Sequence, residues 1–220
     1  MANERPSIFN DVLGPIMRGA SSSHVGGAFR IARLIRLAHG AEHMKSVLCE
    51  FDTFGTQAAT HAGHGSDLGF YCGILGVDLP DPRVPEIFEL AGSMKPEIEI
   101  AVVPLREEDP TLHRVTVTET DGSTHCWDGV TSMGGGMIEM TAYDGFRISM
   151  NGDYYELLVR TASASAAVMK EKIEKLFSPD SILTLEKDKE TLFEVKSGRP
   201  YDAAALAGFR REEALRELRV

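Results

Sequence analysis

The sequence lacks the features of a membrane protein and of a nucleic-acid-binding protein. Its 220 residues contain no uncharged apolar run of about 18 residues, so no transmembrane helix is expected. Acidic residues outnumber basic ones, 33 against 23, and the resulting net charge of −10 repels a phosphate backbone. The first residues form neither a basic nor an apolar segment, so a secretory signal is not expected.

Cysteine is also scarce. Cys49, Cys72 and Cys126 are the three cysteines, and no two of them form a Cys-x-x-Cys pair. This spacing provides no obvious zinc or iron–sulfur ligand set and is typical of buried thiols in a reduced, cytoplasmic protein. Apolar residues make up 43% of the chain, and a chain of this length can bury about 70% of its unfolded surface. We therefore expect a folded cytoplasmic protein with one large or two small domains.

The most distinctive segment that is present is rich in serine. It consists of Ser21, Ser22, Ser23 and His24. We expect a loop over 19–27 and an amphipathic helix from Ala28, with Ser23 as the N-cap residue. Hydroxyl groups and backbone amides at a helix start can bind a carboxylate or a phosphate, and His24 can transfer a proton near neutral pH. A capped helix start with a surface histidine is the alternative.

A second polar segment carries two histidines. Its residues are Thr60-His61-Ala62-Gly63-His64-Gly65-Ser66-Asp67. The glycines on both sides of His64 predict a tight loop that projects this side chain, and a helix is expected from Ser66. His61 and His64 could ligate a metal ion, although no third ligand lies nearby in the sequence. A helix-entry turn with solvated histidines is the alternative.

A third segment contains Gly134, Gly135 and Gly136. No helix is predicted after it, which excludes the dinucleotide-binding pattern. Three glycines allow the backbone to approach another group closely, and a loose hairpin is the alternative.

Hydrophobic periodicity predicts an α+β fold. Strands are expected at 46–51, 97–103, 113–120, 124–127, 137–141 and 147–150, with helices at 66–75 and 84–94. The pattern changes near Asn151. Strands at 154–161, 182–186 and 192–196, with helices at 164–177 and 202–218, the second broken near Gly208, give the order β-α-β-β-α. This order predicts a small ferredoxin-like domain over 151–220, after a mixed α/β domain over 1–150.

Taken together, the segments resemble the β subunit of iron–sulfur-dependent L-serine dehydratase. The motifs that carry the resemblance are Phe9-x-x-x-x-Gly14-Pro15-x-Met17-x-Gly19-x-Ser21-Ser22-Ser23-His24, Thr60-x-x-Gly63-His64-Gly65-Ser66-Asp67 and Ser132-x-Gly134-Gly135-Gly136-x-Ile138. They occur in the family's order and cover about residues 7–150. The carboxyl-terminal region resembles the ACT domain that ends many of these β subunits.

The resemblance implies conversion of L-serine to pyruvate and ammonia. A [4Fe-4S] cluster would bind the substrate hydroxyl, and its ligands are expected on a separate α subunit. On this chain, the resemblance and the loop chemistry favour His64 as the leading proton-transfer residue and His24 as a carboxylate donor or alternative base. The residues expected to bind the small amino-acid substrate are Ser21, Ser22, Ser23, Gly63, Gly65, Ser66, Gly134 and Gly135. Self-association is expected through the ACT-like domain.

Some positions depart from the family's pattern. Val25 and Ser66 stand where the family usually has threonine, and 109–113 replaces a His-Pro-Asn motif. The loop at 161–165 lacks the usual aspartate and glycine of an ACT domain. L-Threonine or another β-substituted amino acid is therefore an alternative substrate. A non-catalytic anion- or amino-acid-sensing domain, as in some 3-phosphoglycerate dehydrogenases, and a free-standing Ser–His hydrolase are alternative functions.

Overall fold

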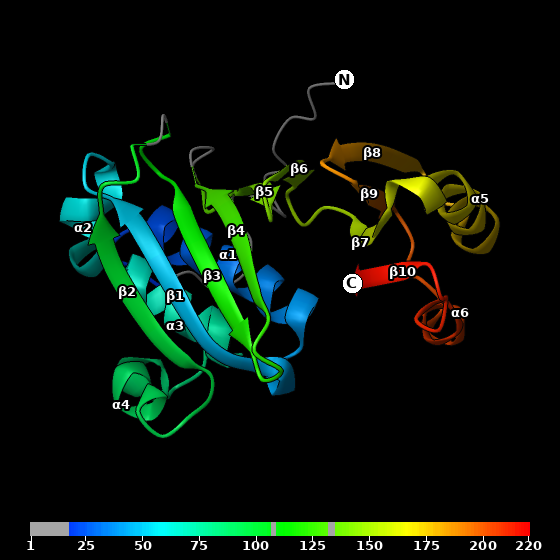
Figure 1. The fold of residues 1–220 in the computed structure, drawn as a ribbon. Coiled ribbons are helices and arrows are strands. Elements are labelled where there is room, and N and C mark those ends of the chain that lie inside the picture. Colours follow the sequence, from blue (N-terminus) through cyan, green and yellow to red (C-terminus); the bar gives the residue numbers. More distant parts are fainter. Residues whose placement is uncertain (1–17, 107–108, 132–134) are drawn as a thin grey trace. The chain divides into compact units, whose positions relative to one another are not determined.

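The computed structural model describes residues 18–106, 109–131 and 135–220 (Figure 1). The chain forms two compact units, Met1–Asp144 and Gly145–Val220. The boundary between them therefore comes before the one predicted from the sequence, at residue 151. Phe9, Gly14 and Pro15 of the first motif and Gly134 of the third lie outside the described residues. In the described part of the chain, no helix combines the length and the apolarity needed to cross a membrane.

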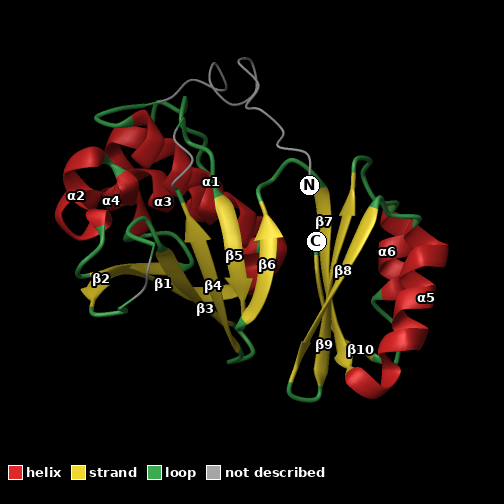
Figure 2. Ribbon diagram, turned by 90° about the horizontal axis from the view of Figure 1, so that it is seen from above, coloured by secondary structure: helices red, strands yellow, loops and turns green. Residues whose placement is uncertain are grey.

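The first unit is a mixed sheet with helices on one face (Figure 2). Its strands are β1 (Met44–Asp52), β2 (Glu97–Val103), β3 (His113–Glu119), β4 (Thr124–Val130) and β5 (Glu139–Tyr143). They follow the order β2-β1-β3-β4-β5, with β1 and β2 parallel and the other neighbours antiparallel. One edge of the sheet therefore collects Asp52, Val103, His113 and Val130. We call it the carboxyl edge, because β1, β2 and β4 end there.

The helices of this unit alternate with its first strands. They are α1 (Ser22–His39), η2 (Ala41–His43), α2 (Thr56–His64), α3 (Ser66–Leu75), η3 (Val84–Glu86) and α4 (Ile87–Ala91). Buried apolar side chains from both layers fill the core, among them Ile31, Ile35, Val47, Phe51, Phe70 and Trp127.

Close contact between α1 and α3 depends on glycine. A Cβ atom on Gly69 would lie 2.1 Å from the carbonyl oxygen of Val25, and one on Gly73 would lie 2.5 Å from that of Phe29. Larger residues would force the two helices apart. The two glycines thus allow the first half of α1 to lie directly against α3.

The predicted loop over 19–27 is wrong, because most of it is helix. α1 begins at Ser22, six residues before the predicted start, and Ser21 rather than Ser23 occupies the N-cap position. Gly27 lies inside the helix, where a Cβ atom would come 2.7 Å from Cγ2 of Thr131. This glycine serves close packing of α1 against the end of β4, and not a loop.

The predicted loop around His64 is also wrong. Thr56–His64 is a helix, and His64 is its last residue. Gly65 has a φ angle of +88° and forms the left-handed C-cap from which α3 starts directly. The second glycine of the motif therefore makes a sharp turn between two helices.

The second unit has the ferredoxin-like topology. Its elements are β6 (Phe146–Met150), β7 (Tyr155–Ala162), η4 (Ser163–Ser165), α5 (Ala166–Phe177), β8 (Ser181–Lys187), β9 (Glu190–Ser197), α6 (Ala203–Phe209) and β10 (Leu215–Arg219). From β7 onward the order β-α-β-β-α-β forms an antiparallel sheet, β10-β7-β9-β8, with α5 and α6 on one face (Figure 2).

These two units confirm the predicted α+β class, and the ACT-like assignment stays a prediction. In the second unit, α6 ends at Phe209, next to the break predicted near Gly208, but the helix expected after this break is wrong, because β10 follows. Residues 211–218 are rich in arginine, glutamate and leucine, which favour helices, but pairing with β7 overrides this local preference.

Candidate functional site

The serine-rich and histidine-rich segments meet in the first unit. The ring centroids of His24 and His64 are 4.8 Å apart, and the rings meet edge to face at 80°. The backbone N–H of Ser21 donates a hydrogen bond to the carbonyl oxygen of His64 over 3.2 Å. The start of α1 and the end of α2 are thereby joined through both backbone and side chains.

Ser21 fixes the ring of His24. Its Oγ atom lies 2.8 Å from Nδ1 of His24, and its side chain makes no capping bond to the helix backbone. The first backbone N–H groups of an α-helix have no acceptor within the helix. α1 also has no acidic residue in its first turn. Its amino end is therefore suited to an anion, because the helix dipole and free N–H donors both favour negative charge there.

His24 is half-buried, whereas His64 is exposed. Burial lowers the pKa of His24, and the nearby His64 ring lowers it further. The lower pKa favours the neutral imidazole of His24 at neutral pH, so this ring can accept or donate a hydrogen bond without carrying charge.

Two side-chain bonds span the turn that carries His64. His61 Nδ1 lies 2.7 and 2.9 Å from the two carboxylate oxygens of Asp67, and Ser66 Oγ donates to Oε1 of Gln57 over 2.8 Å. Ser66 is completely buried, so its hydroxyl faces Gln57 and not solvent. Both bonds link α2 to α3 and hold the turn in one conformation.

The other predicted substrate-binding residues differ in exposure. Ser22 is exposed and Ser23 is half-buried in the first turn of α1. Gly63 is exposed in the last turn of α2, and no atom lies within 4 Å of the position of a Cβ atom there. Gly65 is half-buried, with its Cβ position 2.7 Å from Cγ2 of Val25.

The third glycine segment lies against α1. The Arg30 guanidinium donates to the carbonyl oxygen of Gly136 over 3.3 Å, and Gly27 packs on Thr131 just before the segment. Gly135 is exposed and has a φ angle of +58°. The described part of this segment therefore lies alongside α1, whose amino end carries His24.

Sequence reasoning missed His113. Its side chain is completely buried at the start of β3, with Nδ1–H donating to the carbonyl oxygen of Thr111 over 2.9 Å. Its ring meets Phe51 edge to face at 4.9 Å between centroids, and Nε2 has no hydrogen-bond partner within the described residues. Burial is the main cause that lowers the pKa of His113 to about 4, and the nearby His24 contributes to the lowering. One signal could have indicated His113: β3 is antiparallel to β1, so the first residue of β3 lies at the edge of the sheet where β1 ends.

His113 makes the stability of this unit depend on pH. In the unfolded chain the ring takes up a proton near its ordinary pKa of 6.5, whereas the buried ring stays neutral down to a pKa of about 4. The unfolded state binds more protons between these values, so the free energy of unfolding falls as pH falls through this window, by up to about 3 kcal/mol. Urea unfolding of wild type and His113→Phe at several pH values should show this difference. A difference that does not vary with pH would contradict the buried neutral ring.

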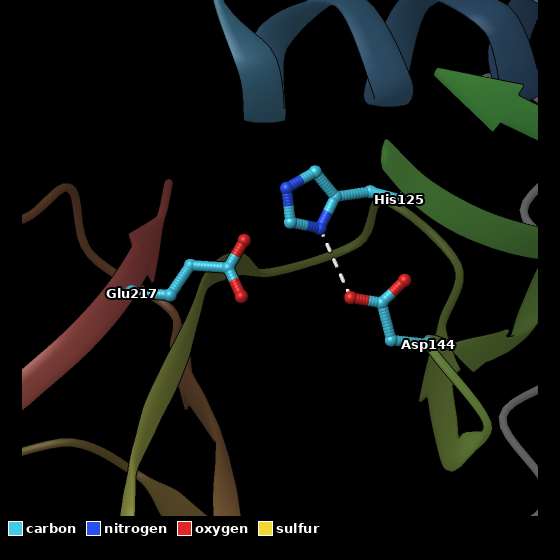
Figure 3. Close-up of side chains that lie close together, drawn as sticks. All are labelled: His125, Asp144 and Glu217. Atoms are coloured by element: carbon cyan, nitrogen blue, oxygen red, sulfur yellow. Dashed lines mark hydrogen bonds and ion pairs between the residues drawn. The ribbon is translucent and has the colours of Figure 1, made fainter. Parts of the chain in front are cut away.

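A second polar cluster lies at the edge of the sheet opposite the carboxyl edge, where β4 begins and β5 ends. Nδ1 of His125 is 3.0 Å from a carboxylate oxygen of Asp144, and the two side chains point toward each other (Figure 3). The Tyr143 hydroxyl is 2.9 Å from the same nitrogen. These residues join the start of β4 to the end of β5, so the cluster is separate from the His24–His64 site.

Two curated proteins are similar to the chain. The "Probable L-serine dehydratase, beta chain" of Bacillus subtilis (strain 168) is 33% identical over 153 residues, which are 70% of this chain and 67% of the relative. The "L-serine dehydratase, beta chain" of Peptoniphilus asaccharolyticus is 31% identical over 150 residues, 68% of this chain and 66% of the relative. The chain belongs to the L-serine dehydratase β-chain family. No family model matches it.

Two of the departures from the family's pattern, Val25 and Ser66, lie where α1 packs against the α2–α3 turn. Val25 is completely buried and contacts the turn at Gly65, and Ser66 is completely buried beside Gln57. Neither side chain has exposed surface for a substrate. These two substitutions in a β chain therefore give no reason to prefer L-threonine over L-serine.

The cysteines of this β chain do not fit an iron–sulfur cluster. Cys49 is on β1, Cys72 on α3 and Cys126 on β4; the first two are buried and the third is half-buried. Burial raises the pKa of all three thiols, that of Cys72 to about 11. A thiol must lose its proton to bind a metal, so these side chains are poor ligands.

Proposed function

We propose that this chain is the β subunit of an L-serine dehydratase and converts L-serine to pyruvate and ammonia together with an α subunit. Membership of the β-chain family supports this proposal. The observation that carries it is the 4.8 Å contact between His24 and His64 beside the amino end of α1. This contact supports the proposal, because imidazole rings can transfer protons and the amino end of a helix is suited to a carboxylate.

The amino end of α1 binds the substrate carboxylate in this proposal. Ser22 and Ser23 present hydroxyl groups and backbone amides in the first turn, and Ser21 orients His24 beside them. Hydrogen bonds to a charged carboxylate are stronger than those between neutral groups, and the helix dipole adds to them. The serines therefore hold the substrate by the group that every amino acid shares.

In this proposal, the two histidines transfer protons. Dehydration removes the proton on Cα and the hydroxyl on Cβ, and the enamine that forms hydrolyses to pyruvate and ammonia. His64 is exposed at the end of α2 and is the leading proton-transfer residue, while His24 donates to the carboxylate or acts as a base. A [4Fe-4S] cluster bound by the α subunit would supply a Lewis acid for the substrate hydroxyl.

A serine hydrolase is a weaker reading of the same residues. Ser21 and His24 are within hydrogen-bond distance, as in a nucleophile–base pair. A hydrolase also needs an acid that orients the histidine. Within the described ranges, no carboxylate hydrogen-bonds to His24, and Asp67 is engaged by His61 instead.

Self-association is proposed for the second unit. β8 is an edge strand of its sheet, and Leu183 on this strand is 47% exposed. An exposed edge strand with apolar side chains favours pairing with another chain, here a second copy.

The function is tested by co-expression with a candidate α chain that carries a cysteine set. The complex, purified without oxygen, should release pyruvate and ammonia from L-serine, and each chain alone should be inactive. Faster turnover of L-threonine than of L-serine would reassign the substrate. A complex that carries its cluster and binds L-serine without turnover would contradict the catalytic proposal and favour a sensing role.

A further inference from the structure

The segment that leads to the His24–His64 site lies at the surface but has the composition of an interface. From Thr53 to Ser66 the sequence contains no aspartate, glutamate, lysine or arginine, although these residues make up 25% of the chain. The segment forms the turn after β1, α2 and the turn into α3. The exposed face of α5, by contrast, carries Glu171, Lys172, Glu174 and Lys175. Charged residues are depleted in the cores of protein–protein interfaces, so the uncharged segment is typical of a surface that a partner covers.

α2 is poorly buried within its own unit. Gln57 is the only residue of α2 that is buried in the described part of the chain. Exposed residues recur every three or four positions and therefore share one face of the helix: Thr56, Ala59, Ala62 and Gly63. We call this face the α2 ridge. A helix of nine residues is too short to be stable alone, so a partner that covers the ridge would add to the burial that stabilises it.

Phe54 is presented to solvent just before α2. Its side chain is 81% exposed, against 62% for Leu37, which comes next among the described large apolar side chains. The backbone beside it is fixed, because the N–H of Gly55 donates to the carbonyl oxygen of Asp52 over 2.9 Å. A Cβ atom on Gly55 would lie 2.8 Å from the carbonyl oxygen of Pro110. An aromatic side chain on an ordered backbone loses little conformational entropy on binding, and aromatic residues are enriched in interfaces.

The proposed function determines where the α subunit must lie. L-Serine held by its carboxylate at the amino end of α1 must reach the cluster with its hydroxyl, and three covalent bonds of about 1.5 Å separate these groups. The surface of the α subunit therefore comes close to His24 and His64. α2 has nine residues and is about 14 Å long, whereas a standard interface of about 800 Å² per partner is about 30 Å across. An interface that includes His64 at one end of α2 thus extends to Phe54 at the other.

We propose that Phe54 and the α2 ridge form the surface that binds the α subunit, and that the Phe54 ring inserts into an uncharged, apolar pocket of that subunit. This inference rests on the proposed function, which requires a cluster-bearing partner beside His64. Covering the ridge also keeps water away from the site, which strengthens the electrostatic interactions with the substrate carboxylate.

Phe54→Ala tests the anchor. The dissociation constant of the full β chain and a candidate α chain, measured by calorimetric titration without oxygen, should rise about 30-fold, as for an interface hot spot. At a saturating concentration of the α chain, kcat should stay at the wild-type value, because Phe54 transfers no proton. Leu37→Ala is the matched control, since Leu37 is exposed near the carboxyl end of α1, away from His24. It should leave the dissociation constant unchanged.

Ala59→Glu tests the ridge. The new carboxylate would be buried without a partner in the interface, so the dissociation constant should rise by about 10²-fold or more. Residue 59 is exposed and glutamate favours a helix, so the thermal midpoint of the isolated chain should stay almost unchanged. Hydrogen exchange needs no variant: the α chain should slow exchange of the amides of 56–64 and leave those of 34–39 as they are.

The outcomes separate the two proposals. Wild-type dissociation constants for both variants, in a complex that turns over L-serine, would overturn the docking surface and leave the function standing. A complex that both variants weaken, and that carries its cluster without turning over L-serine, would contradict the function and support the surface. Analytical ultracentrifugation of the isolated chain covers the remaining occupant. A dimer of this chain that Phe54→Ala and Ala59→Glu dissociate would assign the surface to a second copy and overturn its assignment to the α subunit.

Discussion

Replacing His64 by alanine in the αβ complex is expected to lower kcat for L-serine by about 10³-fold, within the range measured for general acid–base groups. The side chain is exposed at the end of α2, and its ring contacts His24. The backbone bond from Ser21 to the carbonyl oxygen of residue 64 does not depend on the side chain. Thermal unfolding should therefore be almost unchanged, so the loss would be chemical and not structural.

His43→Ala is the matched control for this variant. His43 is also exposed, with 63% of its side chain accessible, and it precedes β1 at the edge opposite the site. Its replacement should leave kcat and KM at their wild-type values. Wild-type turnover in the His64→Ala complex would remove His64 from the mechanism.

Gly69→Ala is expected to destabilise the first unit by about 3 kcal/mol, the upper part of the usual range for overpacking. The new Cβ atom would lie 2.1 Å from the carbonyl oxygen of Val25, which is backbone and cannot rotate away. α1 and α3 must then separate. Urea unfolding of the isolated chain measures the loss, and the contact between His24 and His64 should loosen with it.

Gly63→Ala separates this packing effect from the general effect of a new methyl group. Gly63 is also helical, but no atom lies within 4 Å of its Cβ position. Alanine is favoured over glycine inside a helix, so this variant should gain about 0.5–1 kcal/mol. Equal losses in both variants would contradict the close approach of α1 and α3.

Hydrophobic periodicity was sufficient for most elements of the fold. The alternation in 97–103 and 113–120 predicted β2 and β3, and the apolar spacing in 164–177 predicted α5. These segments bury one face, so local pattern and tertiary environment agree. β10 was missed because its sequence favours a helix and only its pairing with β7 makes it a strand.

The role of glycine was harder to predict. Gly27 looks like a loop residue in the sequence, yet it lies inside α1 and permits close contact with Thr131. Gly69 lies inside the helix predicted at 66–75, but the sequence does not show that it permits close contact with α1. Gly65 is a turn residue, but between two helices and not within a loop. A single sequence does not show which neighbour a glycine will meet, so the lengths of α1 and α2 could not be derived from it.

The site was predictable in its residue types but not in its geometry. Serine and histidine at a helix start and histidine between glycines indicated where to look. The bond from Ser21 to His24, the Asp67–His61 pair and the burial of His113 depend on how α1, α2, α3 and β3 pack. These contacts show which side chains are available for proton transfer and which ones stabilise the turn between α2 and α3. The motif alone does not show this difference.

The most direct test of the account locates the partner's cluster relative to this chain. A reduced, paramagnetic cluster broadens the NMR signals of nearby protons in a complex whose β chain alone is labelled at histidine. The account predicts strong broadening for the rings of His24 and His64 and sharp signals for His43 at the opposite edge. Sharp signals for His24 and His64, with His43 broadened instead, would show that the cluster meets a different surface.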